Sequence, residues 1–562
     1  MSVQTGWQAN RALYQVFERY ADLIEIEGGE DVRKAATYRR AAIALRGLDR
    51  PVDAIAADGR LREIPGIGPV LEAKIQEYLQ TGRIAALDRL EAAVPPGVLE
   101  LLELPGVGAR TAGSLWRGLK VASPAELEAA IRAGRLKELG GFGPKREQTL
   151  LAALTGRGSP RLILSEAWGL AEALRERMLA VPGVSRAEVA GEARRGCPLS
   201  DAVVLVASGE SGPIASMLAA LAIWARDGAP KPVASAVTAT LESGVPLRIV
   251  LAPAAAFGTA MVLATGSAAH AAALGALPAA AEEEGVYSGL DLPFIAPELR
   301  EGAGEVEAAR AGRLPHLITE ADIRGDLHVH SRWSDGSAAV AEMAAAAIQR
   351  GDRYLAITDH SRALVIAHGL GPEEIRRQRR EIEDLKASGA LGGLVLLQGC
   401  EVEVLADGRL DLDDDSLAGL DFVIASLHSR FGQDGPTLTE RALRAVRHPL
   451  VDMIGHPSGR RLPERPEYPI DLERVIDEAA SAGKALEING SPERCDLDGA
   501  WARRAKDRGV PLSVDSDAHS LGGLAGRRFG VMTARRGWLQ PEQALNTKEP
   551  EQLLAWLKGR RA

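Results

Sequence analysis

Six of the ten histidines in this 562-residue chain, all in its second half, combine with three acidic residues in a pattern that could bind metal. The nine side chains are His328, His330, Asp335, His360, Glu401, His428, His456, Asp517 and His519. Imidazole and carboxylate together suit Zn²⁺, Mn²⁺ or Fe²⁺ better than Ca²⁺. Nine ligands exceed what one ion takes. The sequence therefore predicts a cluster of two or three divalent ions, a site for metal-ion catalysis.

Short apolar segments alternate with helical stretches around these nine residues, which lie at or just beyond the segment ends. The expected strands are 326–330, 354–358, 394–398, 421–426, 451–454, 485–488 and 511–514. Such alternation predicts a parallel α/β barrel, (β/α)7, with its site at the C-terminal ends of the strands. Four histidines end no strand beside a partner and are not expected to be ligands: His270, His316, His368 and His448.

A Gly-x-Gly pattern recurs three times in the first third of the chain, each time before a new helix. The glycine pairs are Gly66/Gly68, Gly106/Gly108 and Gly141/Gly143, and Lys145 and Arg146 follow the third. Glycine permits a tight turn with positive φ, which lets backbone N–H groups of the next helix face an anion. The pattern predicts contacts to DNA phosphates, which carry no base information. The alternative is that each pair only closes a helix hairpin.

Composition and charge are those of a globular protein with several domains. Hydrophobic residues make up 46% and charged residues 25% of the chain, and the net charge of −9 argues against a uniformly basic nucleic-acid coat. Three distant cysteines argue against a disulfide framework and fit a reducing cytoplasm. The N-terminus lacks the pattern of a signal peptide. The uncharged run 249–281 contains prolines and is expected to be Ala-rich soluble structure, so no membrane association is expected.

The nine ligand positions, within residues 325–545, resemble those of a PHP (polymerase and histidinol phosphatase) domain. The resemblance implies three metal ions. The first ion would be bound by His328, His330, Glu401 and Asp517, the second by Glu401, His428 and His456, and the third by Asp335, His360 and His519.

Arginines beside these ligands could bind a phosphate. Arg332, Arg430 and Arg460 each lie within a few residues of a ligand. A guanidinium group can clamp two phosphate oxygens at once. The alternative is that all three are solvated loop arginines.

Residues 60–155, with their three glycine pairs, resemble tandem helix-hairpin-helix motifs. Together with amphipathic helices expected at 10–23 and 33–43, the first hairpin resembles the small N-terminal lyase-like domain of family X DNA polymerases. Lys74 falls near the lysine with which repair members of that family form a Schiff base to an abasic sugar. The resemblance thus makes Lys74 a candidate lyase nucleophile, the alternative being a solvated helix lysine.

Residues 161–310 resemble the palm and thumb of the same family, on the segments 180–195, 257–270 and 293–302. Two-metal phosphoryl transfer needs several carboxylates that converge on one point. The family supplies an Asp-x-Asp pair on one strand and a third Asp on a neighbouring strand.

The catalytic positions of this polymerase-like region are altered. Asp201 is present, but Val203 stands at the partner position and Pro246 at the third, and Glu192 replaces the serine of the turn that holds the triphosphate. A one-residue shift in the alignment is the alternative, yet no other Asp-x-Asp lies nearby. We expect a polymerase fold that binds no Mg²⁺ in the palm and has lost synthesis. The vestigial site would comprise Asp201, Arg194 and Arg195.

The order of these parts resembles bacterial family X DNA polymerases across the whole chain. The expected domains are a lyase-like helix-hairpin-helix domain (1–92), tandem helix-hairpin-helix fingers (93–160), a degenerate palm (161–250), a thumb (251–312) and a PHP nuclease domain (325–562). The resemblance implies a cytoplasmic, metal-dependent 3′→5′ exonuclease of base excision repair that acts on gapped or nicked DNA of any sequence. Three alternatives stay open: an active gap-filling polymerase, a small-molecule phosphatase of histidinol phosphatase type, and a non-catalytic DNA-binding scaffold.

Overall fold

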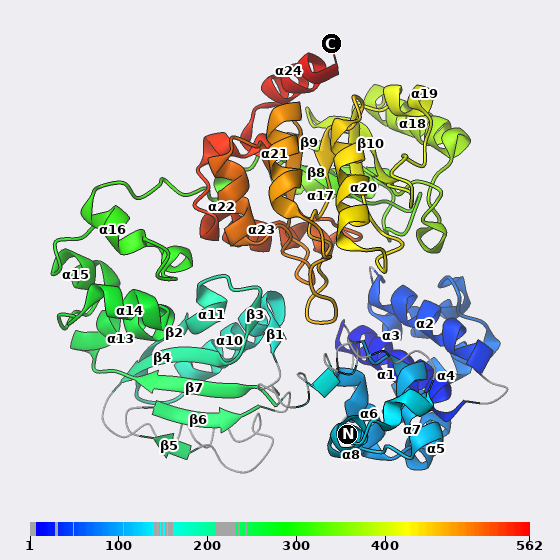
Figure 1. The fold of residues 1–562 in the computed structure, drawn as a ribbon, viewed down its shortest axis with the longest axis horizontal. Coiled ribbons are helices and arrows are strands. Elements are labelled where there is room, and N and C mark those ends of the chain that lie inside the picture. Colours follow the sequence, from blue (N-terminus) through cyan, green and yellow to red (C-terminus); the bar gives the residue numbers. More distant parts are fainter. Residues whose placement is uncertain are drawn as a thin grey trace. The chain divides into compact units, whose positions relative to one another are not determined.

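The computed structural model describes residues 7–28, 32–48, 50–104, 106–139, 161–209, 231–233, 236–241 and 244–561, with isolated positions between 143 and 154. The chain divides into two compact units, Met1–Gly158 and Ser159–Ala562 (Figure 1). Among the described residues, no helix is both long enough and apolar enough to span a lipid bilayer.

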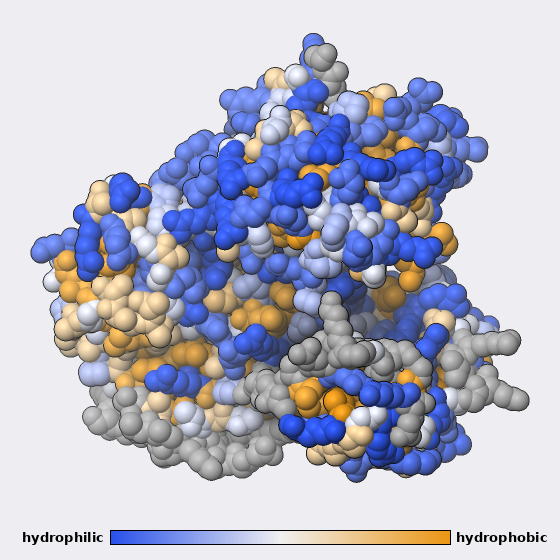
Figure 2. All heavy atoms as spheres, viewed as in Figure 1, coloured by the Kyte–Doolittle hydropathy of each residue, from blue (hydrophilic) through white to orange (hydrophobic). Residues whose placement is uncertain are grey.

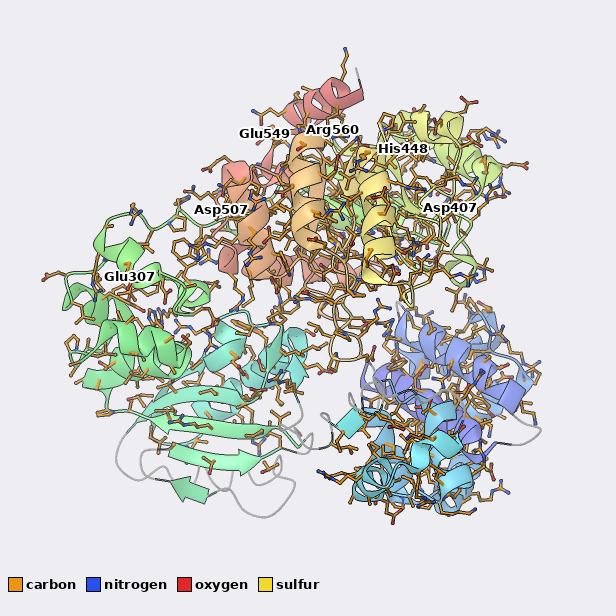
Figure 3. All side chains as sticks on the ribbon, in the orientation of Figure 1. Glu307, Asp407, His448, Asp507, Glu549 and Arg560 are labelled. Atoms are coloured by element: carbon orange, nitrogen blue, oxygen red, sulfur yellow. The ribbon has the colours of Figure 1, made fainter. Side chains whose placement is uncertain are left out.

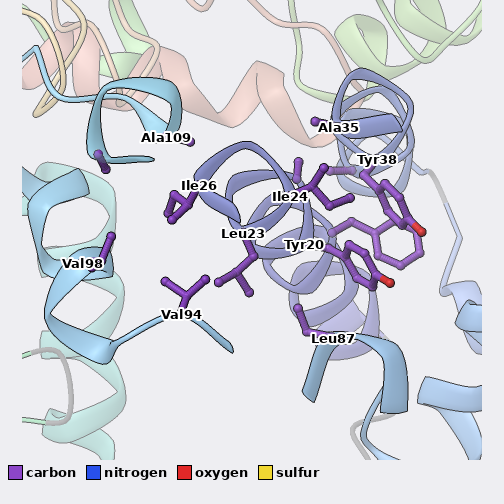
Figure 4. Packing of buried hydrophobic residues seen from close by; sticks show 14 of the residues in the cluster. Tyr20, Leu23, Ile24, Ile26, Ala35, Tyr38, Leu87, Val94, Val98 and Ala109 are labelled. Atoms are coloured by element: carbon purple, nitrogen blue, oxygen red, sulfur yellow. The ribbon is translucent and has the colours of Figure 1, made fainter. Parts of the chain in front are cut away.

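Helices build the first unit around one apolar core. Its α-helices are α1 (Trp7–Glu27), α2 (Val32–Arg46), α3 (Val52–Ala57), α4 (Pro69–Thr81), α5 (Ala85–Ala93), α6 (Pro96–Glu100), α7 (Ala109–Leu119) and α8 (Pro124–Arg132); its 3₁₀ turns are η1 (Leu61–Glu63), η2 (Leu101–Glu103) and η3 (Arg135–Glu138). Apolar residues at helical spacing bury one face of α1. Figure 4 shows Leu23 and Ile24 of α1 in this core, and the ring of Tyr20 stacks on Tyr38 of α2 at 4.3 Å.

The first two Gly-x-Gly turns have the predicted backbone. Gly66 and Gly106 have φ of +84° and +74°, a region that favours glycine. Gly68 and Gly108 are the N-caps of α4 and α7. A Cβ built on any of the four would meet nothing within 4 Å, so both turns face open space. In the third copy Gly143 is exposed, whereas three positions lie outside the described residues: Gly141, Lys145 and Arg146.

A five-stranded mixed sheet, in the order β2-β4-β7-β6-β5, begins the second unit. Its strands are β2 (Val184–Ala190), β4 (Val203–Gly209), β5 (Lys231–Val233), β6 (Ala236–Thr240) and β7 (Pro246–Leu251), and β1 (Leu162–Ile163) pairs separately with β3 (Leu199–Ser200). Strands β4 and β7 run parallel, with Val203 opposite Leu247. The helices α10 (Leu164–Leu179) and α11 (Gly191–Arg194) accompany the sheet, and α10 packs its apolar face on it.

Short helices follow the sheet and are tied together by a buried polar network. They are α13 (Phe257–Thr265), α14 (Ala268–Leu274), α15 (Glu283–Ser288) and α16 (Glu305–Arg310), with 3₁₀ turns η5 (Ala254–Ala256) and η6 (Pro297–Leu299). The ring of His270 on α14 lies 2.7 Å from Glu305 Oε1 and 3.1 Å from Tyr287 Oη. All three side chains are buried, so His270 connects helices inside this region.

The rest of the second unit is a parallel seven-stranded sheet in the order β14-β13-β12-β11-β10-β9-β8. The strands are β8 (Gly325–Val329), β9 (Tyr354–Ile357), β10 (Val395–Glu403), β11 (Phe422–Ser426), β12 (Met453–Ile454), β13 (Ala485–Asn489) and β14 (Leu512–Asp515). The first and last strands approach each other, since His330 N donates to Ala518 O over 2.9 Å and Val329 bridges Ala518. The sheet is thus a nearly closed barrel, which confirms the predicted (β/α)7 architecture.

Helices surround the barrel (Figure 1). They are α17 (Val340–Gln349), α18 (Pro372–Ala387), α19 (Asp414–Ala418), α20 (Gly435–Arg447), α21 (Leu472–Ala482), α22 (Gly499–Asp507), α23 (Arg527–Arg536) and α24 (Pro550–Arg561), with 3₁₀ turns η7 (Glu320–Asp322), η8 (Val365–Ala367), η9 (Gly522–Gly526), η10 (Pro541–Gln543) and η11 (Leu545–Thr547). Arg560 of α24, labelled in Figure 3, donates to the carbonyls of Gly483 (2.7 Å) and Val451 (2.5 Å) and fastens this last helix to the barrel.

Strand β10 is longer than predicted. Its first half pairs with β9, where Gln398 lies opposite Ile357, and its second half pairs with β11, up to Glu403 opposite Ser426. Because the second half of β10 pairs with a different neighbouring strand, its backbone hydrogen bonds continue beyond residue 398, the predicted end of the strand. Glu401 therefore lies within a strand, and not beyond its end.

Ion pairs join the helices α13–α16 and the loops between them to the barrel. Arg536 Nη1 on α23 donates to Glu301 Oε1 over 2.5 Å, and the same oxygen accepts from Arg195 Nε at 2.8 Å. Next to it, Arg535 Nε donates to Glu298 Oε1 over 2.7 Å. Burial raises the pKa of Glu301, but the two guanidinium groups outweigh burial and hold it below the usual carboxyl value. The carboxylate stays charged at the junction.

Candidate metal centre

The barrel brings all nine predicted ligand side chains together at the C-terminal ends of its strands. Eight of them form three overlapping groups, in each of which one nitrogen or oxygen from every residue lies within 4.8 Å of the others; the ninth, His456, contacts Glu401. The groups are His330, Asp335, His360 and His519; His328, His330 and Asp517; and His360, Glu401 and His428. One implied ligand set contained His328, His330 and Asp517, and these three residues do form one of the groups. The implied sets did not combine His360 with Glu401 and His428, which form another group.

Glu401 lies at the centre of the cluster. Its Oε1 is 2.9 Å from His456 Nε2 and 3.2 Å from His428 Nε2. Its other oxygen, Oε2, is 2.9 Å from His360 Nδ1 and 3.3 Å from His328 Nε2. The carboxylate is buried. With imidazoles around both oxygens, Glu401 is placed to bridge two ions.

Buried ring nitrogens without hydrogen bonds show that the cluster fits metal ions. His328 Nε2, both ring nitrogens of His330 and His360 Nδ1 are buried and form no hydrogen bond of good geometry, although carboxylate oxygens lie close to them. Buried polar atoms are rarely left without partners in native proteins. Imidazole nitrogens mixed with carboxylate oxygens are the donor set that Zn²⁺, Mn²⁺ and Fe²⁺ prefer. The residues therefore fit a centre with more than one divalent ion.

Two further carboxylates orient ligand imidazoles, and the sequence analysis missed both. Glu487 Oε1 on β13 lies 2.7 Å from His328 Nδ1, and Glu403 Oε2 on β10 lies 3.0 Å from His428 Nδ1. A carboxylate on one ring nitrogen directs the other nitrogen towards a metal. The available signal was weak: Glu403 follows Glu401 by two residues, which places both on one face of the strand.

Burial and neighbouring charges give the imidazoles very different pKa values. Burial, with help from the cation of Arg494, lowers the pKa of His456 to about 3. Burial also depresses that of His428, but the charge of Glu401 more than offsets it and raises the pKa of His428 to about 9. Glu401 itself is opposed by burial, yet the surrounding imidazoles hold its pKa well below the usual range. The central carboxylate is thus kept ionised, the form that binds a cation.

The three predicted phosphate-binding arginines differ in their availability. Arg460 is buried, and its guanidinium donates to the backbone carbonyls of Arg494 (2.8 Å) and Cys495. Arg332 is exposed, donates to Ser337 O at 2.8 Å and pairs with a glutamate at 3.2 Å. Arg430 is exposed on a residue with φ of +58°. Arg460 therefore has a structural role, while Arg332 and Arg430 stay accessible.

A fourth arginine, which the sequence analysis did not single out, lies against the cluster. Arg494 Nε is 3.5 Å from Asp517 Oδ2, and its side chain is only 18% exposed. Its Nη1 is buried and has no hydrogen-bond partner. It lies in the loop after β13, where the preceding Ser-Pro-Glu gave no signal. A buried donor beside a ligand carboxylate is placed to receive an oxygen from a bound phosphate.

Lys74 of α4 lies in an aromatic environment. Its Nζ donates to Tyr20 Oη over 3.2 Å and lies 4.6 Å from the centre of the Tyr20 ring. The side chain is half-buried. The candidate lyase nucleophile is therefore not a freely solvated lysine.

The residues assigned to a vestigial polymerase site are placed by the structure, which corrects one expectation, that Asp201 and Val203 stand on the same strand. Asp201 does not lie on a strand: β4 begins at Val203, and Asp201 occupies the bend before it. The Asp201 carboxylate pairs with Arg161 at 2.5 Å. Val203 is buried, and the position expected for a third aspartate is Pro246, at the start of β7. Glu192 Oε2 accepts a hydrogen bond from Asp201 N over 2.6 Å, so the two carboxylates brace the turn.

Internal glutamates neutralise both arginines of this site. Arg194 forms two hydrogen bonds to the carboxylate of Glu283, at 2.9 and 2.5 Å. Arg195 donates to Glu301 Oε1 at 2.8 Å and to Thr265 O at 2.7 Å. The guanidinium donors are committed within the fold.

The histidines not expected to be ligands lie outside the three groups. His270 is buried between α14 and α15, and His448, labelled in Figure 3, follows α20 with its Nε2 3.3 Å from Asp414. His368 is exposed at the end of η8, and the backbone of His316 bonds to Gln540.

Family models match three stretches of the chain. A helix-hairpin-helix domain matches residues 8–84, a SAM-like helix-hairpin-helix tandem matches residues 98–155, and a PHP domain matches residues 326–491. These matches define the class: a multidomain protein with helix-hairpin-helix domains at the front and a PHP barrel behind.

Relatives define the family more closely. The chain is 32% identical over 575 aligned residues to the protein of Bacillus subtilis (strain 168) named DNA polymerase/3'-5' exonuclease PolX, and the alignment covers 97% of this chain and 99% of the relative. The chain therefore belongs to the PolX family, the bacterial family X DNA polymerases with a PHP domain. A protein of Thermoanaerobacter sp. (strain X514) named probable phosphatase is 34% identical over 210 residues, 34% of this chain and 78% of that protein. A probable phosphatase of Syntrophotalea carbinolica is 32% identical over 39% of this chain and 90% of its own length.

Proposed function

We propose that this protein is a metal-dependent 3′→5′ exonuclease that trims DNA ends at gaps or nicks during base excision repair. The observation that carries the proposal is the cluster of nine ligand side chains at the mouth of the barrel, most of them buried, in which several buried ring nitrogens form no hydrogen bond. Full-length similarity to a relative named as a polymerase and exonuclease supports DNA as the substrate.

We propose that His328, His330, Asp335, His360, Glu401, His428, His456, Asp517 and His519 bind two or three ions of Mn²⁺, Zn²⁺ or Fe²⁺. Bound there, such ions polarise a phosphoryl oxygen and activate water at neutral pH. The protein's own part is to hold the ligand set. Glu487 and Glu403 fix the rings of His328 and His428, and Glu401 would offer both of its oxygens as ligands.

The phosphate of the scissile bond is proposed to contact Arg494. The buried Nη1 of this residue needs an acceptor, and a non-bridging phosphate oxygen supplies one. Arg332 and Arg430, both exposed, would contact phosphates further along the strand. Arg460 is not proposed for this role, because its guanidinium donates to backbone carbonyls.

The helix-hairpin-helix turns are proposed to grip the DNA backbone. Gly66, Gly68, Gly106 and Gly108 leave open space where a Cβ would stand, so a phosphate can approach the backbone N–H groups of α4 and α7. We assign the same role to the third turn, whose residues are Gly141, Gly143, Lys145 and Arg146. Backbone contacts carry no sequence preference.

We propose that the palm has lost DNA synthesis. Asp201 is paired with Arg161, Arg194 with Glu283, and Arg195 with Glu301. With Val203 and Pro246 at the other two positions, too few carboxylates remain to hold two Mg²⁺ ions. The palm would then serve as a docking platform and not as a site of synthesis.

A second candidate is hydrolysis of a small phosphate monoester. The relatives named probable phosphatases match only the barrel, which supports a phosphatase site of the same design. The helix-hairpin-helix domains argue against this candidate, because a small substrate does not require contacts to a DNA backbone.

One experiment separates these functions. An end-labelled primer on a gapped template is incubated with the protein, Mn²⁺ and all four nucleotides, and the products are resolved on a sequencing gel. A ladder of shortened primers without extension supports the exonuclease. Bands longer than the primer would instead show an active polymerase. An intact primer, combined with hydrolysis of p-nitrophenyl phosphate, would show a small-molecule phosphatase.

A further inference from the structure

Two consecutive apolar residues are exposed to solvent on a loop beside the candidate metal centre. Ile366 is 83% exposed and Val365 is 78% exposed, the two highest values among the exposed large apolar side chains of the described residues. Elsewhere on the barrel, hydrophilic side chains cover most of the face shown in Figure 2, and hydrophobic ones are scattered. Single exposed apolar residues are ordinary, but an adjacent pair at a loop tip calls for an explanation. We name Val365 and Ile366 the apolar apex.

The loop that carries the apolar apex is held at its base by the metal centre itself. Leu370 N donates to His360 O over 2.7 Å, and Ser361 N donates to Glu401 O over 3.0 Å. Ala363 N also donates to Asp411 Oδ2 over 2.6 Å. The two ends of the loop therefore lie against two candidate ligands. Any movement of the loop base would move those ligands as well.

The inner side of the loop is packed while its apex stays exposed. Ala367 and Leu370 are buried just behind the apex. At Gly369, a Cβ would stand 1.9 Å from Ser361 O, so the two sides of the loop approach as closely as backbones can. Val365 and Ile366 are thus exposed on an ordered loop whose inner residues bury their side chains.

The position and size of the apex favour a nucleobase as its occupant. Val365 follows His360 by five residues, so the apex lies at most about 18 Å from that ligand along the chain. Bases on one strand are about 3.4 Å apart, which puts the last few nucleotides of a bound strand within reach. Two side chains are far fewer than the roughly 20 residues a side of a stable protein interface. Arg362 beside the apex is exposed, but its charge is paired with Asp411 at 3.6 Å, so the apex itself offers an apolar surface for the base.

We propose that the apolar apex is a wedge that packs against the base of the 3′-terminal nucleotide and keeps it unstacked from its pairing partner. Apolar side chains such as isoleucine and leucine act in this way when they insert between base steps. The inference rests on the proposed exonuclease, since a strand must lead its terminal phosphate into the barrel. In this proposal Val365 and Ile366, which are not candidate metal ligands, separate the 3′-terminal base from its partner before cleavage.

The test compares a paired and an unpaired 3′ end. The double variant Val365→Ser/Ile366→Ser is measured with Mn²⁺ on a recessed, fully paired 3′ end and on the same DNA with three unpaired 3′ nucleotides. We expect about tenfold slower cleavage of the paired end, because unstacking is no longer assisted, and a change within about twofold on the unpaired end. Val365→Leu/Ile366→Leu should cleave both like the unmodified protein. Leu554→Ser removes an exposed apolar side chain (42% exposed) from α24, away from the apex, and is the control.

Two further readouts separate the wedge from other causes. A 2-aminopurine base at the paired 3′ end should brighten when the unmodified protein binds and stay quenched with the serine variant. Hydrolysis of bis(p-nitrophenyl) phosphate, which has no base, should be equal for both proteins. Equal loss on both DNAs, equal loss on the small ester, or unchanged rates would overturn the wedge. So would a change in sedimentation, which would make the apex a contact with a second copy. Failure of the unmodified protein to shorten either DNA, with the small ester still hydrolysed, would overturn the proposed exonuclease itself.

Discussion

Glu487 holds two of the candidate ligands at once. Its Oε1 lies 2.7 Å from His328 Nδ1, and its Oε2 accepts a hydrogen bond from the backbone N–H of His456 over 2.6 Å. The carboxylate is buried, so no water competes for these bonds. One side chain on β13 thereby fixes the ring of a residue on β8 and the loop that follows β12.

Glu487→Gln should weaken metal binding. The amide cannot accept from both partners as strongly, and loss of such an outer partner typically lowers metal affinity about 10- to 100-fold. Titration calorimetry with Mn²⁺ measures the change directly. Glu549→Gln, at an exposed ion pair with Arg324, is the matched control and should bind Mn²⁺ normally. Equal affinity in the Glu487 variant would show that the hydrogen bond does not position His328.

Glu401→Ala and His360→Ala should each lower nuclease activity on the order of a thousandfold or more. Each variant removes a candidate metal ligand, and both residues belong to the same ligand group. DNA binding, followed by fluorescence anisotropy without metal, should be unchanged. Glu307→Ala, at an exposed residue of α16, should keep both properties. If either ligand variant lost DNA binding together with activity, DNA binding and cleavage would not reside in separate domains.

Arg494→Ala should reduce kcat/KM on DNA by about 10- to 100-fold, the worth of one charged hydrogen bond to a phosphate. Arg494→Lys should recover part of the loss, since it restores the charge but not the fork of donors. Arg461→Ala, an exposed arginine paired with Glu493, provides the comparison and should change the rate less than about threefold. A loss of the same size in both alanine variants would point to general electrostatics in place of a specific contact.

Glu283 should make the helices α13–α16 sensitive to acid. Burial raises its pKa, but Arg194 and Arg300 outweigh burial and lower it, so the folded-state pKa lies below the unfolded one. The stabilisation is therefore complete above the unfolded value of about 4.3 and is lost as the pH falls through the folded pKa. Calorimetric melting from pH 7 to pH 3 should show this loss.

Glu283→Gln tests the same group at neutral pH. Arg300 is fully buried and would keep its charge without its partner, which costs about 3–5 kcal/mol. The variant should melt earlier at pH 7 and show a weaker dependence on acid than the unmodified protein. An unchanged melting temperature would mean that Arg300 finds other acceptors.

Val203→Asp alone should not restore DNA synthesis. The position expected for the third carboxylate would still be Pro246, and Arg194 and Arg195 would remain paired with glutamates. Primer extension with Mg²⁺ and four nucleotides checks this outcome, with Val206→Asp as a control for a buried charge on the same strand. Robust extension by the single variant would refute the assignment of an inactive palm.

The ligand set and the barrel could be predicted from the sequence because both depend on residue patterns within short segments of the chain. Histidines and carboxylates recur at the ends of short apolar strands, and each parallel strand delivers its C-terminal residues to the same end of the barrel. The seven strands were placed to within a few residues on this basis. The turns at Gly66 and Gly106 were equally readable, since positive φ demands a residue type that stands out in the sequence.

Only the tertiary structure decided which side chains meet. The partnership of Glu487 with His328 joins residues 159 positions apart, and no local pattern marks it. The sequence favoured Arg460 as a phosphate ligand and gave no signal for Arg494, yet Arg460 donates to backbone carbonyls, whereas Arg494 has a buried nitrogen that forms no hydrogen bond. The exposure of Val365 and Ile366 is likewise a matter of packing, because apolar residues next to a strand would ordinarily be assigned to the core. Residue type sets what chemistry a side chain can perform, and long-range packing determines whether it is available.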